Sequence, residues 1–313
     1  MWHCRTRAGA RRTNQQRQPG EGKRMKVGFI GLGAMGWHMA ANLAAKGFLR
    51  AVYTRQRQQA EDFAAQYQVK AATSAVQLWD DCDVIVLCIP ADRDVMETVE
   101  ALGVPAAKGR LVIDSSTVAR ETAIDAAELL AKVGARFLDA PITGGTEGAR
   151  LARLTFMVGG TPEDYVAALP LFEAMGQRHI HIGPHGSGQA TKAVNQVMAA
   201  GVAQAVTEGL AFAAALQLPL HLVVDAVGTG AAGSWFVQNR SRGMIDGEYP
   251  PGFKVALHHK DLMICQQMAA QLGGDLPCVD TTLAQYQTLM AEGHGEEDIS
   301  SLYRLNKRLF PQH

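Results

Sequence analysis

The sequence lacks most of the features that would place it in a specialised class of protein. It has no net charge, because 30 Lys and Arg are balanced by 30 Asp and Glu. Composition therefore gives no electrostatic reason to expect nucleic acid as a partner. The five cysteines are scattered over 313 residues and form no C-x-x-C pair. We expect free thiols in a reducing compartment and no disulfide framework.

The sequence also lacks a metal-binding signature, an internal repeat and an uninterrupted apolar run of membrane length. In the stretch RHIHIG, the alternating His179 and His181 are expected to face solvent. The longest apolar stretch, residues 189–218, is interrupted by polar side chains that include Lys192 and Asn195. A membrane span needs about 20 predominantly apolar residues. We therefore expect no bound metal and no membrane partner, and interpret residues 189–218 as a buried helix.

The first 24 residues differ in composition from the rest of the chain. They carry seven Arg and Lys, have Glu21 as their single acid, and show no apolar periodicity, which predicts disorder. They could be an organelle transit peptide or a translated upstream stretch before a true start at Met25. We favour the second explanation because a strand pattern begins directly after Met25. It predicts a cytoplasmic protein, whereas a transit peptide would place it in the mitochondrial matrix.

The most informative stretch that is present is a glycine motif between a strand and a helix. Lys26–Ile30 has the apolar pattern of a strand, and residues 35–46 have that of a helix. Between them Gly31, Gly33 and Gly36 have the spacing G-x-G-x-x-G. In the dinucleotide-binding fingerprint these glycines allow a tight turn, close approach of a pyrophosphate and close packing of helix on strand. The helix N-terminus would face the phosphates.

Strand and helix patterns alternate up to about residue 185, and helical patterns follow. This order predicts an α/β fold, with an N-terminal doubly wound Rossmann domain and an all-α C-terminal domain joined by a long helix. We expect a disordered basic tail at 1–24, a dinucleotide-binding domain at 25–185 and a helical substrate and dimerisation domain at 186–313. The predicted strands are 26–30, 51–53, 69–71, 83–89, 110–114, 136–140, 154–158 and 179–182, and the predicted helices are 35–46, 56–67, 74–79, 94–102, 121–133, 189–218, 221–227, 235–244, 255–272, 277–292 and 299–308.

The residues after the second predicted strand bear on the choice of cofactor. An NAD-preferring site usually has an acid there, on the ribose 2′-OH. Here Tyr53 is followed by Thr54 and Arg55, and the first acid is Glu61. Arg55 offers a planar fork for a 2′-phosphate, although it could also belong to a solvated basic loop. We expect NADP to be preferred over NAD. The predicted cofactor contacts in these two loops are Gly31, Leu32, Gly33, Ala34, Met35, Gly36, Thr54 and Arg55.

Five short motifs follow one another along the chain: GLGAMG (31–36), DSSTV (114–118), DAPITGG (139–145), GQATKAVNQ (188–196) and HKDL (259–262). Together they resemble the β-hydroxyacid dehydrogenase family, the relatives of 3-hydroxyisobutyrate dehydrogenase, tartronate semialdehyde reductase and glyoxylate/succinic semialdehyde reductases. The resemblance covers about residues 25–310. It implies a Rossmann domain, a helical domain and reversible hydride transfer between a nicotinamide and a small β-hydroxyacid or short semialdehyde.

The resemblance assigns catalysis to Lys192, the lysine of the family's K-x-x-N motif. As an ammonium it would protonate the developing alkoxide in reduction. In oxidation it must be neutral, so its pKa should be lowered by burial. Asn195 lies one helical turn further on the same face and can bind substrate or hold Lys192. Gln196 stands where many relatives have a second Asn.

The resemblance also implies the remaining contacts. In DAPITGG the Thr143 hydroxyl and the N–H groups of Gly144 and Gly145 can form a cradle for the substrate carboxylate. The family usually has Ser at Thr143, and the additional methyl group narrows the pocket. Thr117 and Lys260 match cofactor contacts, and Phe253 and Asp261 match residues near the substrate. Asp261 could equally be a helix-surface acid. Trp235 is expected in the core, with the pocket wall as its alternative place.

Two other functions stay open. An imine reductase shares this architecture but generally replaces the lysine. A non-catalytic dinucleotide-dependent binding protein would keep the glycine loop and lose Lys192 or the Thr-Gly-Gly loop. The small residues of the long helix would allow close packing, and we expect a homodimer or homotetramer.

Overall fold

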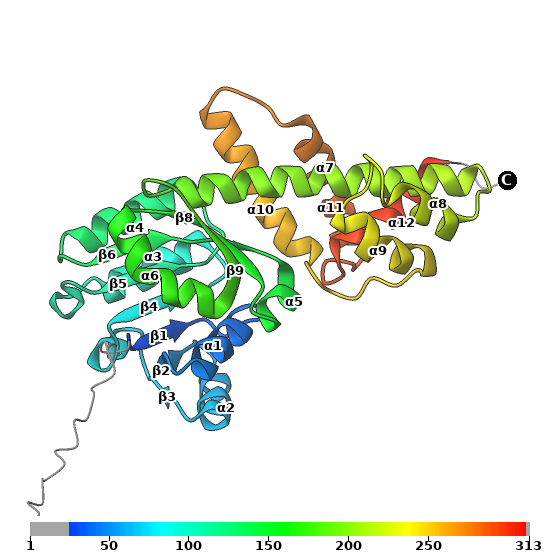
Figure 1. The fold of residues 1–313 in the computed structure, drawn as a ribbon. Coiled ribbons are helices and arrows are strands. Elements are labelled where there is room, and N and C mark those ends of the chain that lie inside the picture. Colours follow the sequence, from blue (N-terminus) through cyan, green and yellow to red (C-terminus); the bar gives the residue numbers. More distant parts are fainter. Residues whose placement is uncertain (1–24, 311–313) are drawn as a thin grey trace, which may run out of the picture.

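The computed structural model describes residues 25–310, and the predicted tail at 1–24 lies outside them. An α/β part carries the sheet and a helical part follows it, with one long helix, α7, running through both (Figure 1). The sheet has the strand order β3-β2-β1-β4-β5-β6, followed by β8 and β7, with β9 beside β8. The predicted fold class is confirmed. The strands are β1 Val27–Ile30, β2 Leu49–Tyr53, β3 Lys70–Ala71, β4 Val84–Leu87, β5 Leu111–Asp114, β6 Arg136–Asp139, β7 Ile142–Thr143, β8 Leu154–Gly159 and β9 Gly176–Gly183.

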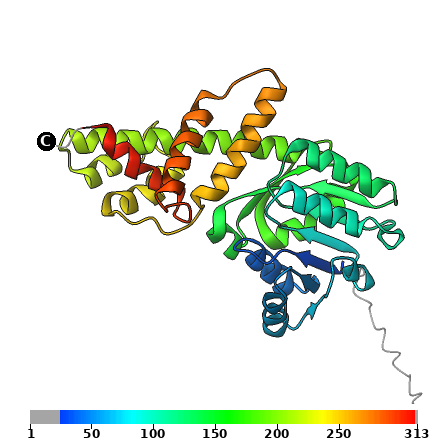
Figure 2. The ribbon, with the colours of Figure 1, turned by 180° about the vertical axis from the view of Figure 1, so that it is seen from behind.

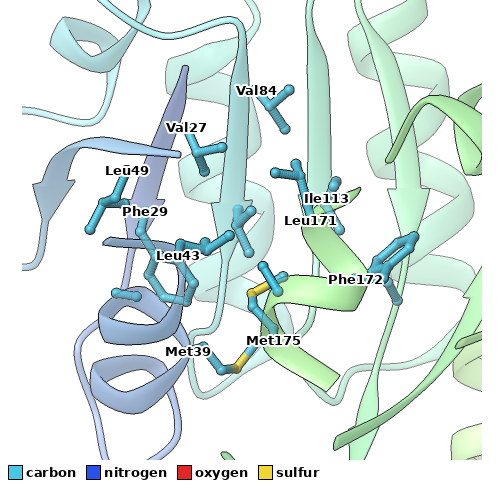
Figure 3. Packing of buried hydrophobic residues seen from close by; sticks show 14 of the residues in the cluster. Val27, Phe29, Met39, Leu43, Leu49, Val84, Ile113, Leu171, Phe172 and Met175 are labelled. Carbon is cyan, nitrogen blue, oxygen red and sulfur yellow. The ribbon is translucent and has the colours of Figure 1, made fainter. Parts of the chain in front are cut away.

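Helices cover both faces of the sheet because its strands are apolar on both sides. In β4, Val84 and Val86 pack into one core while Ile85 and Leu87 pack into the other, the alternation that a two-residue period requires. Figure 3 shows the first of these cores between the sheet and helices. It is covered by α1 (Gly36–Ala45), α2 (Arg57–Tyr67) and α6 (Pro162–Met175), and the second core by α3 (Asp92–Leu102) and α4 (Arg120–Ala131).

The structure contains elements that the sequence did not predict. They are β7, the short helix α5 (Gly145–Arg150) and α6. The start of α6 did carry a signal, since Thr161 accepts a hydrogen bond from Asp164 N at 3.2 Å and Pro162 occupies the first turn. The helix predicted at 74–79 is a 3₁₀ turn, η1 (Val76–Asp80), and a second 3₁₀ turn, η2 (Pro105–Ala107), follows α3.

The expectation that His179 and His181 face solvent is wrong. Their rings pack against Tyr165 of α6, and Tyr165 Oη lies 2.8 Å from His179 Nδ1. The alternate residues Ile180 and Ile182 are the exposed ones, at 42% and 43%. Helix α6, which the sequence did not predict, covers the histidine face of β9.

The helical part is built along α7 (Ser187–Ala215), as both views show (Figures 1 and 2). Among residues 25–310, α7 is the one helix long and apolar enough to cross a membrane by length and composition. Its buried residues include Lys192, Gln196 and Thr207, and it contacts α10 and α11. The remaining helices are α8 (Leu220–Val227), α9 (Trp235–Asp246), α10 (Val255–Gln271), α11 (Pro277–Ala291), η3 (Ile299–Leu302), α12 (Tyr303–Asn306) and η4 (Lys307–Leu309), so the helix predicted at 299–308 is divided into short turns.

Asp139, the last residue of β6, attaches the sheet to α7. Its carboxylate accepts hydrogen bonds from Gly186 N at 2.8 Å and Gln189 N at 3.0 Å. An anion at this place satisfies the free N–H groups of the helix N-terminus and complements its dipole. The start of α7 is therefore fixed at the carboxyl edge of the sheet. The domain boundary predicted at 185–186 falls between β9 and α7 and stays a prediction.

Candidate active site

The glycine loop after β1 has an open surface and a crowded base. Gly31 has φ +94°, and a side chain there would overlap the carbonyl oxygen of Cys88. A side chain on Gly36 would overlap the carbonyl oxygen of Gly31, so the start of α1 packs directly on the turn. By contrast, a Cβ on Gly33 would meet nothing within 4 Å. The loop thus has room for a pyrophosphate beside the α1 N-terminus, and its residues fit a bound dinucleotide.

Arg55 lies at the end of β2, where the sequence predicted it to select the cofactor. Its side chain is 65% exposed, and its Nη2 lies 2.7 Å from Asp94 Oδ1 in α3. β2 and β4 flank β1, so this ion pair crosses the point where the strand order reverses. Nothing in the sequence pointed to Asp94 as a partner of Arg55. An exposed pair contributes only about 0–1 kcal/mol, so a phosphate can compete for the same guanidinium.

The loop after β5 is held from the helical part. Lys260 Nζ donates to the carbonyl oxygen of Thr117 at 2.6 Å. Gln189 Nε2 donates to the carbonyl oxygen of Ser116 at 2.8 Å, and its Oε1 accepts from Val118 N at 3.2 Å. The two predicted cofactor residues, Thr117 and Lys260, are thus brought together. Gln189 was missed as a site residue, although it lies within the GQATKAVNQ motif.

Lys192 lies on the second turn of α7 and is 7% exposed. Burial lowers its pKa to about 8, against the opposing effect of the Asp261 carboxylate, which favours the ammonium form. Among residues 25–310, no side chain or carbonyl is placed to accept a hydrogen bond from its Nζ. Lys192 is therefore a buried amine whose proton is easily lost near neutral to mildly basic pH.

Polar side chains connect α7 with α10 next to Lys192. Asn195 Nδ2 donates to Gln196 Oε1 at 2.8 Å, and Gln196 Nε2 donates to Asp261 Oδ2 at 2.6 Å. Asp261 Oδ1 lies 2.9 Å from Lys260 Nζ. Asp261 is buried, so the alternative of a helix-surface acid is wrong. The four predicted residues form one network on the helical side of the site.

His258 contacts this network through the backbone of Gln196. It was not predicted from the sequence as a site residue. Burial lowers its pKa to about 4, so the ring is neutral at physiological pH. Its Nε2 lies 3.3 Å from the carbonyl oxygen of Gln196 and its Nδ1 lies 3.0 Å from Tyr286 Oη. With its hydrogen on Nε2, the ring donates to Gln196 and accepts from Tyr286. The only sequence signal for this role of His258 was that a polar residue lies on the buried face of a predicted helix.

The Thr143–Gly145 loop faces the helical part across the site. Gly144 and Gly145 are exposed and have φ +129° and +65°. A Cβ on Gly145 would lie 4.0 Å from the carbonyl oxygen of Gly252, the residue before Phe253. The Phe253 ring packs on His258, with centroids 5.0 Å apart. The predicted carboxylate cradle therefore lies beside the segment of the helical part that carries Phe253.

The expected core position of Trp235 is wrong. Its side chain is 59% exposed, and the guanidinium of Arg240 lies over its ring at 4.8 Å. Trp235 is the first residue of α9, where Ser234 caps the helix by accepting from Val237 N at 3.1 Å. At this place the ring cannot reach the core, which is filled by its neighbours Phe236 and Val237.

The cysteines and the groups of possible metal ligands are the remaining reactive side chains among the described residues. Cys82, Cys88, Cys265 and Cys278 are free thiols. Within residues 25–310 no group of three His, Cys, Asp or Glu side chains is close enough to hold a metal ion.

The open glycine loop on a doubly wound sheet and the buried Lys192 of α7 fit a nicotinamide-dependent oxidoreductase. Residues 26–183 match the family model of the NAD-binding domain of 6-phosphogluconate dehydrogenase, and residues 186–306 match that of the NAD-binding region of NADP-dependent 3-hydroxyisobutyrate dehydrogenase. The chain belongs to the β-hydroxyacid dehydrogenase family, as its motifs predicted.

Named relatives agree with this placement over nearly their whole length. The chain is 34% identical to 2-hydroxy-3-oxopropionate reductase of Escherichia coli, covering 89% of this chain and 96% of the relative. It is 33% identical to an NAD-dependent L-serine dehydrogenase of Pseudomonas aeruginosa, covering 90% and 97%. A solved structure of Mycobacterium tuberculosis 3-hydroxyisobutyrate dehydrogenase with L-serine is similar with a TM-score of 0.83 at 29% identity, covering 90% and 99%.

Proposed function

We propose that the protein reduces a short semialdehyde to a β-hydroxyacid, or catalyses the reverse oxidation, with Lys192 as general acid and base. The observation that carries this proposal is the buried Lys192, whose pKa is lowered to about 8, on the helix that joins the two parts of the site. A general acid–base group works best when its pKa lies near the operating pH. The family supplies the reaction class, which is NAD(P)-dependent hydroxyacid oxidation.

Lys192 moves the proton in this scheme. The nicotinamide, when bound, would supply or accept the hydride. In reduction, the Lys192 ammonium donates a proton from Nζ to the oxygen that develops negative charge. In oxidation, the neutral amine removes the proton from the substrate hydroxyl. Both forms are available near pH 8, and the Asp261 carboxylate keeps the ammonium form accessible despite burial.

The remaining predicted residues bind substrate and cofactor in this proposal. The Thr143 hydroxyl and the backbone of Gly144 and Gly145 take the substrate carboxylate, and Asn195 and Gln196 orient the reacting end. Phe253 closes the apolar side, and Asp261 fixes Gln196. Thr117 and Lys260 would lie at the nicotinamide end of the cofactor.

We also propose NADP as the preferred cofactor, with NAD as the alternative. Arg55 supports this preference, because its guanidinium is exposed at the end of β2. Its partner Asp94 competes with a 2′-phosphate for that guanidinium. One relative is named as NAD-dependent, and a solved relative at 24% identity contains NADP⁺. Both cofactors therefore need to be measured.

The test is a cofactor-oxidation assay over a panel of semialdehydes, 2-hydroxy-3-oxopropionate among them, with hydroxyacids assayed in the reverse direction. We expect turnover of at least one short carboxylate-bearing substrate, faster with NADPH than with NADH. Turnover of cyclic imines together with inactivity toward every semialdehyde and hydroxyacid would favour the imine reductase alternative. Cofactor binding without turnover of any substrate would favour a binding protein.

Homo-oligomerisation is a further part of the proposal. Val194, Met198 and Phe212 of α7 are large apolar side chains exposed along the helix, which is typical of a surface that another subunit covers. Light scattering during gel filtration would test for a dimer or tetramer. A cytoplasmic location and the absence of nucleic-acid and membrane partners stay predictions.

A further inference from the structure

The two ends of the loop after β5, residues 115–119, are held by the α/β part. At the first end, Ser115 N donates to the carbonyl oxygen of Leu87 in β4 at 2.8 Å. At the other end, Ala119 N donates to Asp92 Oδ1 of α3 at 2.7 Å. The sheet and α3 therefore fix where the loop begins and ends, but these contacts do not reach its middle.

The middle of the loop is held by one side chain of α7. Gln189 Nε2 donates to the carbonyl oxygen of Ser116 at 2.8 Å, and Gln189 Oε1 accepts from Val118 N at 3.2 Å. A glutamine amide has a donating and an accepting end, and here each end meets its complement on one side of Thr117. Gln189 is 1% exposed, so water does not compete for these two hydrogen bonds.

Thr117 is the residue between the two that Gln189 holds. Its carbonyl oxygen accepts from Lys260 Nζ at 2.6 Å. Its N–H and its hydroxyl have no hydrogen-bond partner among residues 25–310. Thr117 is half-buried, whereas Ser116 and Val118 on either side are buried. The N–H and hydroxyl of Thr117 are therefore polar groups of the loop that remain available to a ligand.

The position of Gln189 is itself fixed on the sheet. Its N–H donates to Asp139 Oδ2 at 3.0 Å. A side chain on the preceding Gly188 would overlap the carbonyl oxygen of Asp139, so the start of α7 packs directly on the end of β6. Gln189, Lys192 and Gln196 follow one another at i, i+3 and i+7, which places them on one face of the helix, and all three are buried. The helix face that carries Lys192 therefore also holds the loop after β5.

We propose that Gln189 is a positioning residue, which fixes Thr117 relative to Lys192 by bonding the loop on both sides of Thr117. The inference rests on the proposed function, in which hydride transfer beside Thr117 and proton transfer from Lys192 act on one substrate. The loop and the lysine must then keep a constant separation. A displacement of about 1 Å can lower the rate of such a reaction about 10²-fold.

The variant Gln189→Met tests the inference, because methionine keeps the length of the side chain and loses both hydrogen bonds. The matched control is Gln204→Met, about four turns further along α7. The Gln204 amide also bonds to another element, since its Nε2 lies 3.0 Å from Thr282 Oγ1 and 2.6 Å from Gln285 Oε1 in α11. The control therefore removes comparable hydrogen bonds of the same helix without touching the loop.

Hydrogen exchange followed by mass spectrometry measures the loop in the full chain without substrate or cofactor. In Gln189→Met, the peptide that contains residues 115–119 should exchange about tenfold faster than in wild type, because the N–H of Val118 loses its partner. Gln204→Met should leave the exchange of this peptide unchanged.

The single-turnover rate of NADPH oxidation with a semialdehyde measures hydride transfer. In Gln189→Met this rate should fall about 10- to 10²-fold, while KM for the semialdehyde changes little. Gln189→Glu is a second variant, which keeps the acceptor for Val118 N and, when ionised, loses the donor to Ser116. It should change the exchange and the rate in the same direction. Gln204→Met should keep the wild-type rate.

The outcomes separate this inference from the proposed function. Unchanged exchange of the loop in both Gln189 variants overturns the inference, whatever the activity. Faster exchange with an unchanged single-turnover rate overturns it too, and so does an equal loss of rate in Gln204→Met. If wild type turns over no semialdehyde or hydroxyacid, the proposed function fails, and the exchange of the loop still decides whether Gln189 holds Thr117.

Discussion

Gln196 Nε2 donates a hydrogen bond to Asp261 Oδ2 over 2.6 Å and so joins α7 to α10 one turn beyond Lys192. The same carboxylate lies 2.9 Å from Lys260 Nζ, and Lys260 in turn holds the Thr117 carbonyl of the α/β part. Asp261 is thus the centre of a chain of contacts from α7 to the loop after β5. Its charge also acts on the protonation of Lys192.

Removing the charge of Asp261 should move the pH profile of oxidation. Asp261 raises the pKa of Lys192 and so opposes the larger lowering by burial. Asp261→Asn therefore lowers the pKa further, and kcat/KM for hydroxyacid oxidation should rise at lower pH than in wild type. Lys260→Met should shift it the other way, because the Lys260 charge lowers the pKa of Lys192.

The control for these two variants is Asp225→Asn, at an exposed position paired with Arg242. It should leave the profile where it is. Identical profiles for wild type and Asp261→Asn would show that Asp261 does not act on the group that titrates.

Cofactor preference should depend on the Arg55–Asp94 pair. Arg55→Gln is expected to weaken NADPH binding by about 1.5–3 kcal/mol, the range for a charge-assisted contact, with much less effect on NADH. Asp94→Asn releases the guanidinium and should strengthen NADPH binding by up to about fivefold, which corresponds to the upper range for an exposed pair. Fluorescence titration of both cofactors measures these changes.

Arg57→Gln is the matched control, because Arg57 is exposed nearby and pairs with Glu61 within α2. Equal losses for NADPH and NADH in Arg55→Gln would refute the assignment of Arg55 to the 2′-phosphate.

Asp114, at the end of β5, should make stability depend on pH. Burial raises its pKa from 3.8 to about 6, so the folded state binds this proton more tightly than the unfolded state. The stabilisation of the fold that comes from binding this proton is fully present below about pH 4, and it is lost as the pH rises through about 6. Relative to wild type, Asp114→Asn should therefore gain stability between pH 4 and pH 7, by at most about 3 kcal/mol.

Chemical denaturation at several pH values measures this change, and the exposed Asp80→Asn serves as control. Asn keeps the acceptor for Ser116 N, which lies 2.9 Å from Asp114 Oδ1. A constant offset between variant and wild type across the pH range would mean that Asp114 does not titrate in this window.

The sequence predicted the sheet and the glycine loop because these depend on local patterns. Apolar runs such as Val84–Leu87 can be recognised in the sequence without knowing which residues pack against them. The same holds for the spacing of Gly31, Gly33 and Gly36. The contacts of Lys192, Asp261 and Lys260 were implied by motifs, but their geometry depends on how α7 and α10 cross. Asp94 could not be found, since the meaning of a charge near the surface depends on what faces it. Trp235 was misplaced for the same reason.

The role of Lys192 is the central claim, and the pH dependence of Lys192→Ala is its most direct test. For wild type, kcat/KM for oxidation should rise through one ionisation near pH 8, where burial places the pKa of Lys192. In Lys192→Ala, kcat should fall by about 10²–10⁴-fold, with NADPH binding retained, and that ionisation should be absent from the residual activity. Lys132→Ala, at an exposed position at the end of α4, should behave as wild type. Near wild-type turnover by Lys192→Ala, with the ionisation still present, would contradict the account.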